Sequence, residues 1–174
     1  GNWTQVGLTN ADAASARFMR IAIVDIAGSS AKEIVAGGKE GASVGQFAAL
    51  GYFSSATPRT AGSWTFTEVT RVGWTMQLYV EDLDGDTDKD IVYTDRDPIN
   101  EPDDSTKRGL RWLKNPAVGG GGWTAHQISP IEGQHKWFSL YDWDGDGDKD
   151  IMDCRSNPAP SFINTTREIS GIMS

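Results

Sequence analysis

Apolar and polar residues alternate along many short segments of this chain, and turn-forming residues such as Gly, Asn and Asp separate the segments. Alternation with a period of two is typical of β-strands that bury one face. Only the stretch from Asn10 to Ala16 has a short helical pattern. The strands that the pattern predicts are 5–8, 20–24, 33–36, 46–50, 66–69, 77–80, 91–93, 110–114, 125–128, 137–140, 151–153 and 162–164.

A sequence repeat organises these strands. Three Trp-Thr pairs are each followed by an alternating strand and then by a loop that starts with Asp; the pairs begin at Trp3, Trp64 and Trp123, and the loops at Asp25, Asp82 and Asp142. Four short strands per repeat are typical of the blades of a β-propeller. We therefore predict an all-β fold, with residues 1–174 forming a single propeller-type domain of three four-stranded antiparallel repeats, approximately 3–63, 64–122 and 123–174.

The repeats are cut out of phase by one strand. The chain begins at a Trp-Thr pair and stops near the place where the next pair is expected, so we expect strand 5–8 to complete the sheet of the last repeat. Three blades are too few for a ring, because propellers typically have about 4–8. The candidates for closure are a dimer that completes a ring, a polymer, or further blades of a longer chain. We favour self-association, because an open propeller leaves two apolar blade faces in water.

Two of the three loops have a carboxylate at every second position, and much of the net charge of −8 comes from them. Like charges this close repel one another unless a cation lies between them. Ca²⁺ takes oxygen ligands from alternate positions of a tight loop, with position 7 acting through its main-chain carbonyl. We predict two calcium sites, whose ligands are Asp82, Asp84, Asp86, Asp88 and Asp90, and Asp142, Asp144, Asp146, Asp148 and Asp150.

The loop from Asp25 to Glu33 keeps the same turn but has Ala27 at position 3 and Ala31 at position 7. We predict that this loop is empty. The other two loops are not EF-hands, because an EF-hand loop ends with a bidentate Glu at position 12 and lies between helices. Position 12 is Tyr93 in one loop and Asp153 in the other, and both follow strand-like segments.

The pattern Asp-x-Asp-Gly-Asp-x-Asp-x-Asp-Ile, the segments 111–116 and 123–128, and the repeat itself resemble FG-GAP/VCBS repeats. These are calcium-loop blades found in integrin α-subunit propellers and in many bacterial extracellular proteins. The resemblance covers nearly the whole chain and implies a propeller with calcium ligands at positions 1, 3, 5 and 9 of the second and third loops. The first loop departs from the family pattern at Ala27 and Ala31, and the blade count departs from the usual seven.

These observations predict a calcium-stabilised extracellular or cell-surface module with a structural or binding role. One alternative is a carbohydrate-binding, lectin-like module; the other, implied by the resemblance, is an enzyme related to polysaccharide lyases or dehydratases. A glycan or a protein is a possible ligand. An acidic chain without a basic stripe does not bind nucleic acid through its phosphates. Membrane insertion is not expected either, because no apolar run approaches the ~20 residues that a bilayer requires.

Neither histidine belongs to a recognisable catalytic pattern. We expect His126 to pack within a blade, His135 to be solvated, and Cys154 to be a small core residue. The three periodic tryptophans are expected in blade cores, whereas the remaining four are possible surface platforms for sugar rings: Trp74, Trp112, Trp137 and Trp143.

Overall fold

The structure is a computed structural model, and it describes residues 4–5, 7–8, 17–39, 48–95, 109–116, 121–129, 135–155 and 161–163. These residues form no helix, so the described part of the chain has no helix that is long and apolar enough to cross a membrane. The strands are β1 (Arg17–Val24), β2 (Glu33–Lys39), β3 (Ala48–Ser54), β4 (Thr65–Val72), β5 (Leu78–Glu81), β6 (Asp90–Asp95), β7 (Gly109–Lys114), β8 (Thr124–Gln127), β9 (His135–Tyr141), β10 (Asp150–Arg155) and β11 (Ser161–Ile163).

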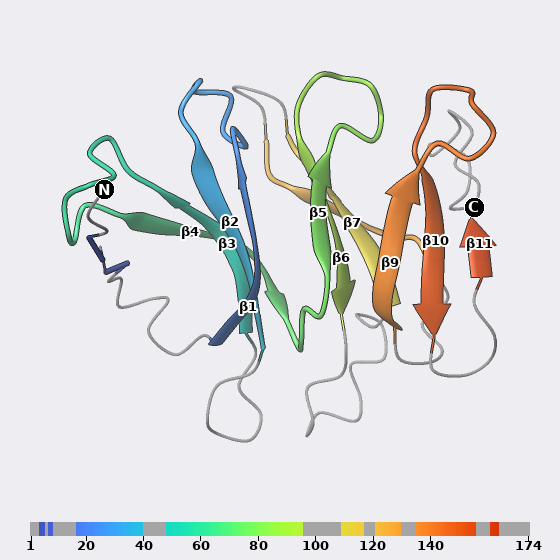
Figure 1. Cartoon of the computed structure of the whole chain (residues 1–174), viewed down its shortest axis with the longest axis horizontal. Coiled ribbons are helices and arrows are strands. Elements are labelled where there is room, and N and C mark those ends of the chain that lie inside the picture. Colours follow the sequence, from blue (N-terminus) through green and yellow to red (C-terminus); the bar gives the residue numbers. More distant parts are fainter. Residues whose placement is uncertain are drawn as a thin grey trace.

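The strands form three separate antiparallel sheets in which neighbours in the sequence are neighbours in space (Figure 1). The first sheet has the order β1-β2-β3-β4, the second β5-β6-β7-β8, and the third β11-β10-β9. The all-β prediction is confirmed. The sheets also follow the predicted offset of one strand, because β4 and β8, which begin directly after Trp64 and Trp123, complete the sheets of the preceding repeats.

The prediction for strand 5–8 is wrong in the described part of the chain. Gln5, Gly7 and Leu8 form no strand, and no described residue before β1 pairs with the third sheet, which has three strands. The helical pattern at residues 10–16 lies outside the described residues. Over the described residues the sheets do not close into a ring.

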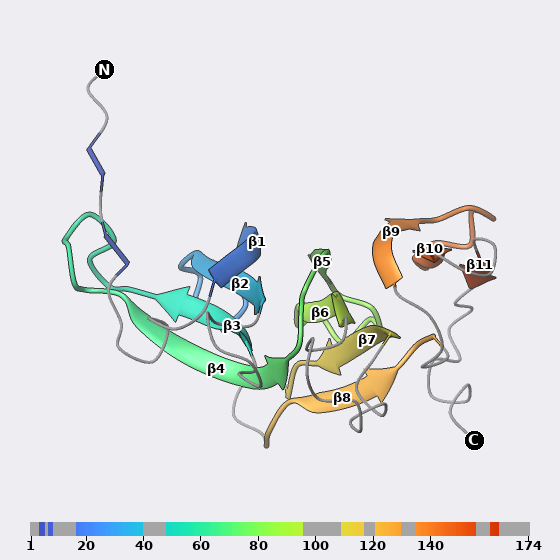
Figure 2. The same cartoon turned by 90° about the horizontal axis from the view of Figure 1, so that it is seen from below.

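The sheets are arranged like a fan, with β1, β5 and β9 together on one side and β4 and β8 on the other (Figure 2). Arg20 of β1 holds the converging side together. Its Nε donates to the Met76 carbonyl at 2.6 Å, and its guanidinium lies 4.9 Å from the centre of the Trp137 ring in β9. A cation over an indole face is attracted by the ring quadrupole. The first strand of the first sheet thus contacts the first strand of the third.

Two apolar cores lie between successive sheets and account for the fan. The core between the first and second sheets includes Val35 and Leu50 on one side and Leu78 and Ile91 on the other. The core between the second and third sheets is built on Val92, Leu110, Trp112, Phe138 and Ile151. Burial of these apolar surfaces between facing sheets stabilises the arrangement.

Gly51 lies in β3 at a point where β3 and β4 of the first sheet approach each other closely. A Cβ at this position would overlap the Thr67 carbonyl oxygen and lie 2.9 Å from Cζ of Phe66. We expect Gly51→Ala to lower the free energy of unfolding by about 1–3 kcal/mol, because β3 and β4 must separate to admit the methyl group. Gly122→Ala is the control, since a Cβ there meets nothing within 4 Å. Urea unfolding checks this, and equal midpoints for the two variants would contradict it.

Candidate metal centre

Each loop begins with an aspartate whose two carboxylate oxygens accept backbone amides from further along the same loop. For Asp82 the donors are Gly85 and Thr87, at 2.8 and 2.9 Å. These bonds wrap the backbone around the first carboxylate and hold the loop curled. The equivalent donors are Ser29 and Ser30 for Asp25, and Gly145 and Gly147 for Asp142.

A second carboxylate closes each loop from its ninth position, which is the first residue of the next strand. Asp90 accepts the amide of Leu83 at 3.2 Å, the loop's second residue. Glu33 accepts Ile26 at 3.0 Å, and Asp150 accepts Trp143 at 2.7 Å. All three closing carboxylates are buried. The three loops therefore share one frame, although their sequences differ.

The sixth loop position has a left-handed backbone in all three loops, with φ of 63° at Ser30, 78° at Thr87 and 95° at Gly147. A β-branched residue is strained there, because its Cβ approaches the carbonyl oxygen. Thr87 is held in this conformation by its bond to Asp82. The second loop thus stores strain that Gly147 avoids in the third.

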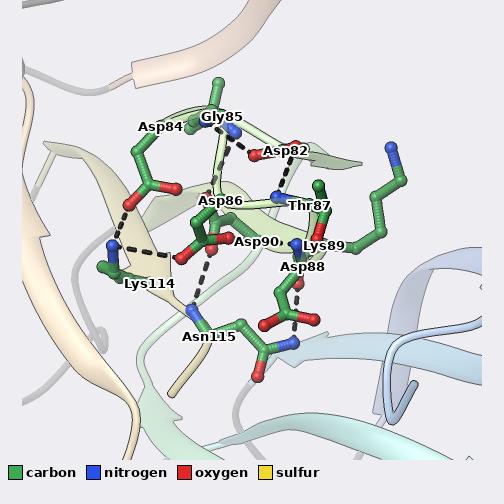
Figure 3. A network of polar contacts seen from close by, with 11 residues as sticks. Asp82, Asp84, Gly85, Asp86, Thr87, Asp88, Lys89, Asp90, Lys114 and Asn115 are labelled. Carbon is green, nitrogen blue, oxygen red and sulfur yellow. Dashed lines mark hydrogen bonds and ion pairs between the residues drawn. The ribbon is translucent and has the colours of Figure 1, made fainter. Parts of the chain in front are cut away.

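Carboxylates at the first, third and fifth positions of the second loop converge (Figure 3). Asp82, Asp84 and Asp86 each offer one oxygen, and these oxygens lie within 4.8 Å of one another. Ca²⁺–oxygen distances of about 2.3–2.6 Å allow ligands on opposite sides of an ion to be about 5 Å apart. The spacing therefore fits a single hard cation. The oxygens need only contract slightly around it.

Lys114 of β7 lies against this cluster (Figure 3). Its Nζ contacts the carboxylate of Asp84 and lies 3.2 Å from Asp86. The hydrogen bond to Asp84 raises the pKa of Lys114. Desolvation tends to raise the pKa of Asp86, but the Asp88 amide and Lys114 outweigh it and lower that pKa. Without a metal ion, the lysine ammonium partly neutralises the loop.

Asp90 is predicted to be a ligand but does not belong to this cluster. One of its oxygens accepts Leu83, and the other accepts the amide of Asn115 at 2.8 Å. Burial is the largest influence and raises the pKa of Asp90 to about 6, although these two amides lower it. Asp88 also lies outside the cluster; its amide donates to Asp86 at 3.0 Å.

The third loop brings together a slightly different set. Asp142, Asp144 and Asp150 offer oxygens within 4.8 Å of one another, whereas Asp146 and Asp148 are not in this group. The ninth-position carboxylate therefore joins the cluster here but not in the second loop. The six clustered residues come from the ten that the sequence predicts.

Among the described residues the first loop forms no such cluster. Its fifth position is Ser29, whose hydroxyl donates to Glu33 at 3.2 Å, and Asp25 is occupied by amides. The first loop therefore lacks the carboxylates of the third, fifth and seventh positions, and its lack of a metal ion stays a prediction. The first loop also shows that the frame forms without these carboxylates.

Asn115 links the first two loops, which the sequence did not indicate. Its backbone amide donates to Asp90, and its side-chain amide donates to the carbonyls of Ile26 and Lys89, both at 2.9 Å. One residue at the end of β7 therefore joins the closing carboxylate of the second loop to the backbone of the first.

The prediction that His135 is solvated is wrong. His135 is fully buried, its Nδ1 lies 2.6 Å from Asp153, and its Nε2 lies 3.1 Å from the Ser129 hydroxyl. The order Ser-His-Asp resembles a catalytic triad. However, Ser129 is also buried and its hydroxyl accepts the Leu110 amide at 2.9 Å. The network therefore braces the second sheet against the third and presents no nucleophile to a substrate.

Other candidate residues divide between core and surface. His126 stacks on Trp112 with ring centroids 4.6 Å apart, as the packing prediction requires. Burial, and after it the charge of Lys114, lowers the pKa of His126.

Trp64 and Trp123 pack against the cores, whereas Trp3 lies outside the described residues. Of the possible platforms, Trp112 is buried and Trp74 half-buried, and Trp137 and Trp143 are exposed. Cys154 is exposed, which contradicts its assignment to the core.

Neither the models of known protein families nor the curated proteins match this sequence. The resemblance to FG-GAP/VCBS repeats therefore stays a prediction from the motif.

The buried network of Ser129, His135 and Asp153 can be tested by mutation, with the second histidine of the chain as the control. We expect His135→Leu to lower the free energy of unfolding by about 3 kcal/mol, because it removes the imidazole that contacts the buried Asp153 carboxylate and the buried Ser129 hydroxyl. His126→Leu removes the other histidine from a half-buried site and should cost less than about 1 kcal/mol. Calorimetric unfolding of both variants decides the matter; similar losses would mean that the network contributes little.

Proposed function

We propose that this chain is a calcium-stabilised module of propeller-type blades, with a structural or binding role outside the cell or at its surface. The observation that carries the proposal is the recurrence of a three-carboxylate cluster in the same loop frame of two successive sheets. Oxygen-only ligands in a curled loop are the donor set that Ca²⁺ prefers. The blade-like order of strands and the fan of sheets support the propeller.

The metal would join parts of the loop that the backbone bonds leave separate. The frame already fixes the first and ninth positions. Asp84 and Asp86 of the second loop (Figure 3), and Asp144 of the third, add carboxylates from middle positions of their loops to the clusters. A divalent ion held there would tie the loop tip to its base and remove the repulsion between the carboxylates. Calcium at extracellular concentration would keep such sites filled.

The two clusters differ in composition. In the second loop Lys114 lies against Asp84 and Asp86, whereas the cluster of the third loop includes Asp150, a strand residue. An ion in the second loop would therefore compete with the Lys114 ammonium for two of its ligands, and this competition should lower its affinity.

The carbohydrate-binding alternative has one observation in its favour. Tyr141 and Trp143 form an exposed edge-to-face pair beside the third loop, with ring centroids 5.4 Å apart. Exposed aromatic rings can stack on sugars. A catalytic role has no comparable support, since the triad-like residues are buried.

Calcium titration followed by calorimetry tests the proposal. We expect two binding events, and Asp84→Asn and Asp144→Asn should each abolish one, because each removes a charged ligand of a different cluster. The metal should raise the unfolding free energy by about 2.7 kcal/mol per site at a 100-fold excess over Kd.

Asp88→Asn is the matched control. It removes the same charge from the same loop, but Asp88 is outside the cluster and would act only through its main-chain carbonyl, so both events should persist. Loss of a site in the control, or unchanged stoichiometry in Asp84→Asn and Asp144→Asn, would show that the loops only attract ions non-specifically.

A further inference from the structure

Successive sheets pack against one another through opposite faces, and the same two kinds of face meet at both contacts inside the chain. We call the side of each sheet that points toward the preceding sheet its leading face, and the opposite side its trailing face. Strand register identifies the equivalent residues, because Ile23–Ile34, Val80–Ile91 and Leu140–Ile151 are corresponding cross-strand pairs on the leading faces. Trailing-face residues Val35 and Val92 occupy corresponding positions in the cores that follow them.

The leading face of the first sheet is exposed along β1, although Phe53 and Phe66 on the same face are buried in a cluster of their own. Ile21 and Ile23 are 63% and 67% exposed. Their equivalents in the other sheets are covered: Leu78 is 8% and Phe138 4% exposed, and Val80 and Leu140 are half-buried. The residue type is apolar in all three sheets, but among the described residues no sheet lies in front of β1 of the first sheet.

The trailing face of the third sheet is uncovered in the same way. Met152 is 39% exposed, although its equivalents Val35 and Val92 are fully buried. Trp143 is 56% exposed, whereas Ile26, at the same loop position of the first sheet, is 3% exposed and packs in the first intersheet core. Tyr141 and Cys154 are exposed on the same face.

We propose that the leading face of the first sheet and the trailing face of the third are the two halves of one interface between copies of this chain. The proposal deepens the proposed blade-type module but does not depend on its metal. The exposed positions on both faces correspond in strand register to positions that are covered where successive sheets meet within the chain, so the partner that fits each is the opposite end of a second copy.

The side chains of the two faces are complementary in size. The leading face offers the branched aliphatic side chains of Ile21 and Ile23, and the trailing face offers the larger Tyr141, Trp143 and Met152. An interface between unlike faces is heterologous, and it closes when the rotations complete a turn. Two copies of three sheets would give six blades, within the typical range of about 4–8. A closed dimer leaves neither face in water.

Sedimentation equilibrium of the full chain, with and without Ca²⁺, tests this. We expect a mass about twice the chain mass of 18.9 kDa. Ile23→Glu on the leading face and Met152→Glu on the trailing face should each weaken association at least about tenfold, since a carboxylate would be buried without a partner. Both positions are exposed within one chain, so folding should survive. Thr124→Glu, at an exposed position of β8 outside both faces, should leave the mass unchanged.

An equal mixture of the Ile23→Glu and Met152→Glu proteins distinguishes the mode of contact. The mixture keeps one intact pair of faces, so it should associate more strongly than either variant alone. If Met152→Glu leaves the dimer intact, or if the mixture behaves like the separate variants, the head-to-tail arrangement is wrong. A wild-type monomer that binds two calcium ions overturns this proposal alone, whereas a dimer that binds none overturns only the metal proposal.

Discussion

The fold of each loop that begins at Asp25, Asp82 or Asp142 depends on the carboxylate at its ninth position. This carboxylate accepts a hydrogen bond from the backbone of the same loop. Glu33, Asp90 and Asp150 each begin a strand, are buried, and accept the amide of the loop's second residue. A buried carboxylate is costly unless it is hydrogen-bonded, and a loop amide is costly unless it has an acceptor. Each satisfies the other, and this pairing sets where the loop begins and ends relative to the sheet.

This constraint also connects the loops to the contacts between sheets. The loop's second residue is apolar, and Ile26 and Leu83 pack into the cores toward the following sheets. Asn115 adds a polar link from Asp90 to the first loop. Loop closure and sheet packing are therefore coupled, and a metal that stiffens a loop would also stiffen the contact with the next sheet. The first loop shows that the coupling can form through Glu33 and Ser29 alone.

Much of this arrangement could be predicted from the sequence, because its signals are local. Alternation located all the strands from β1 to β11 within a few residues, and the Trp-Thr period predicted that β4 and β8 join the preceding sheets. The aspartate spacing identified both carboxylate clusters. What failed depended on contacts between distant segments. His135 meets Asp153 across the β9–β10 pair and Ser129 only when the second and third sheets pack, and nothing near it in the sequence indicates burial. Cys154 follows apolar residues in the sequence but is exposed, on a face that none of the described sheets covers.

The most direct test is an anomalous difference map from crystals of the full chain grown with Ca²⁺. The account predicts one peak among Asp82, Asp84 and Asp86, another among Asp142, Asp144 and Asp150, and none in the loop from Asp25 to Glu33. Empty carboxylate clusters at saturating calcium, or an ion bound in the first loop instead, would contradict it.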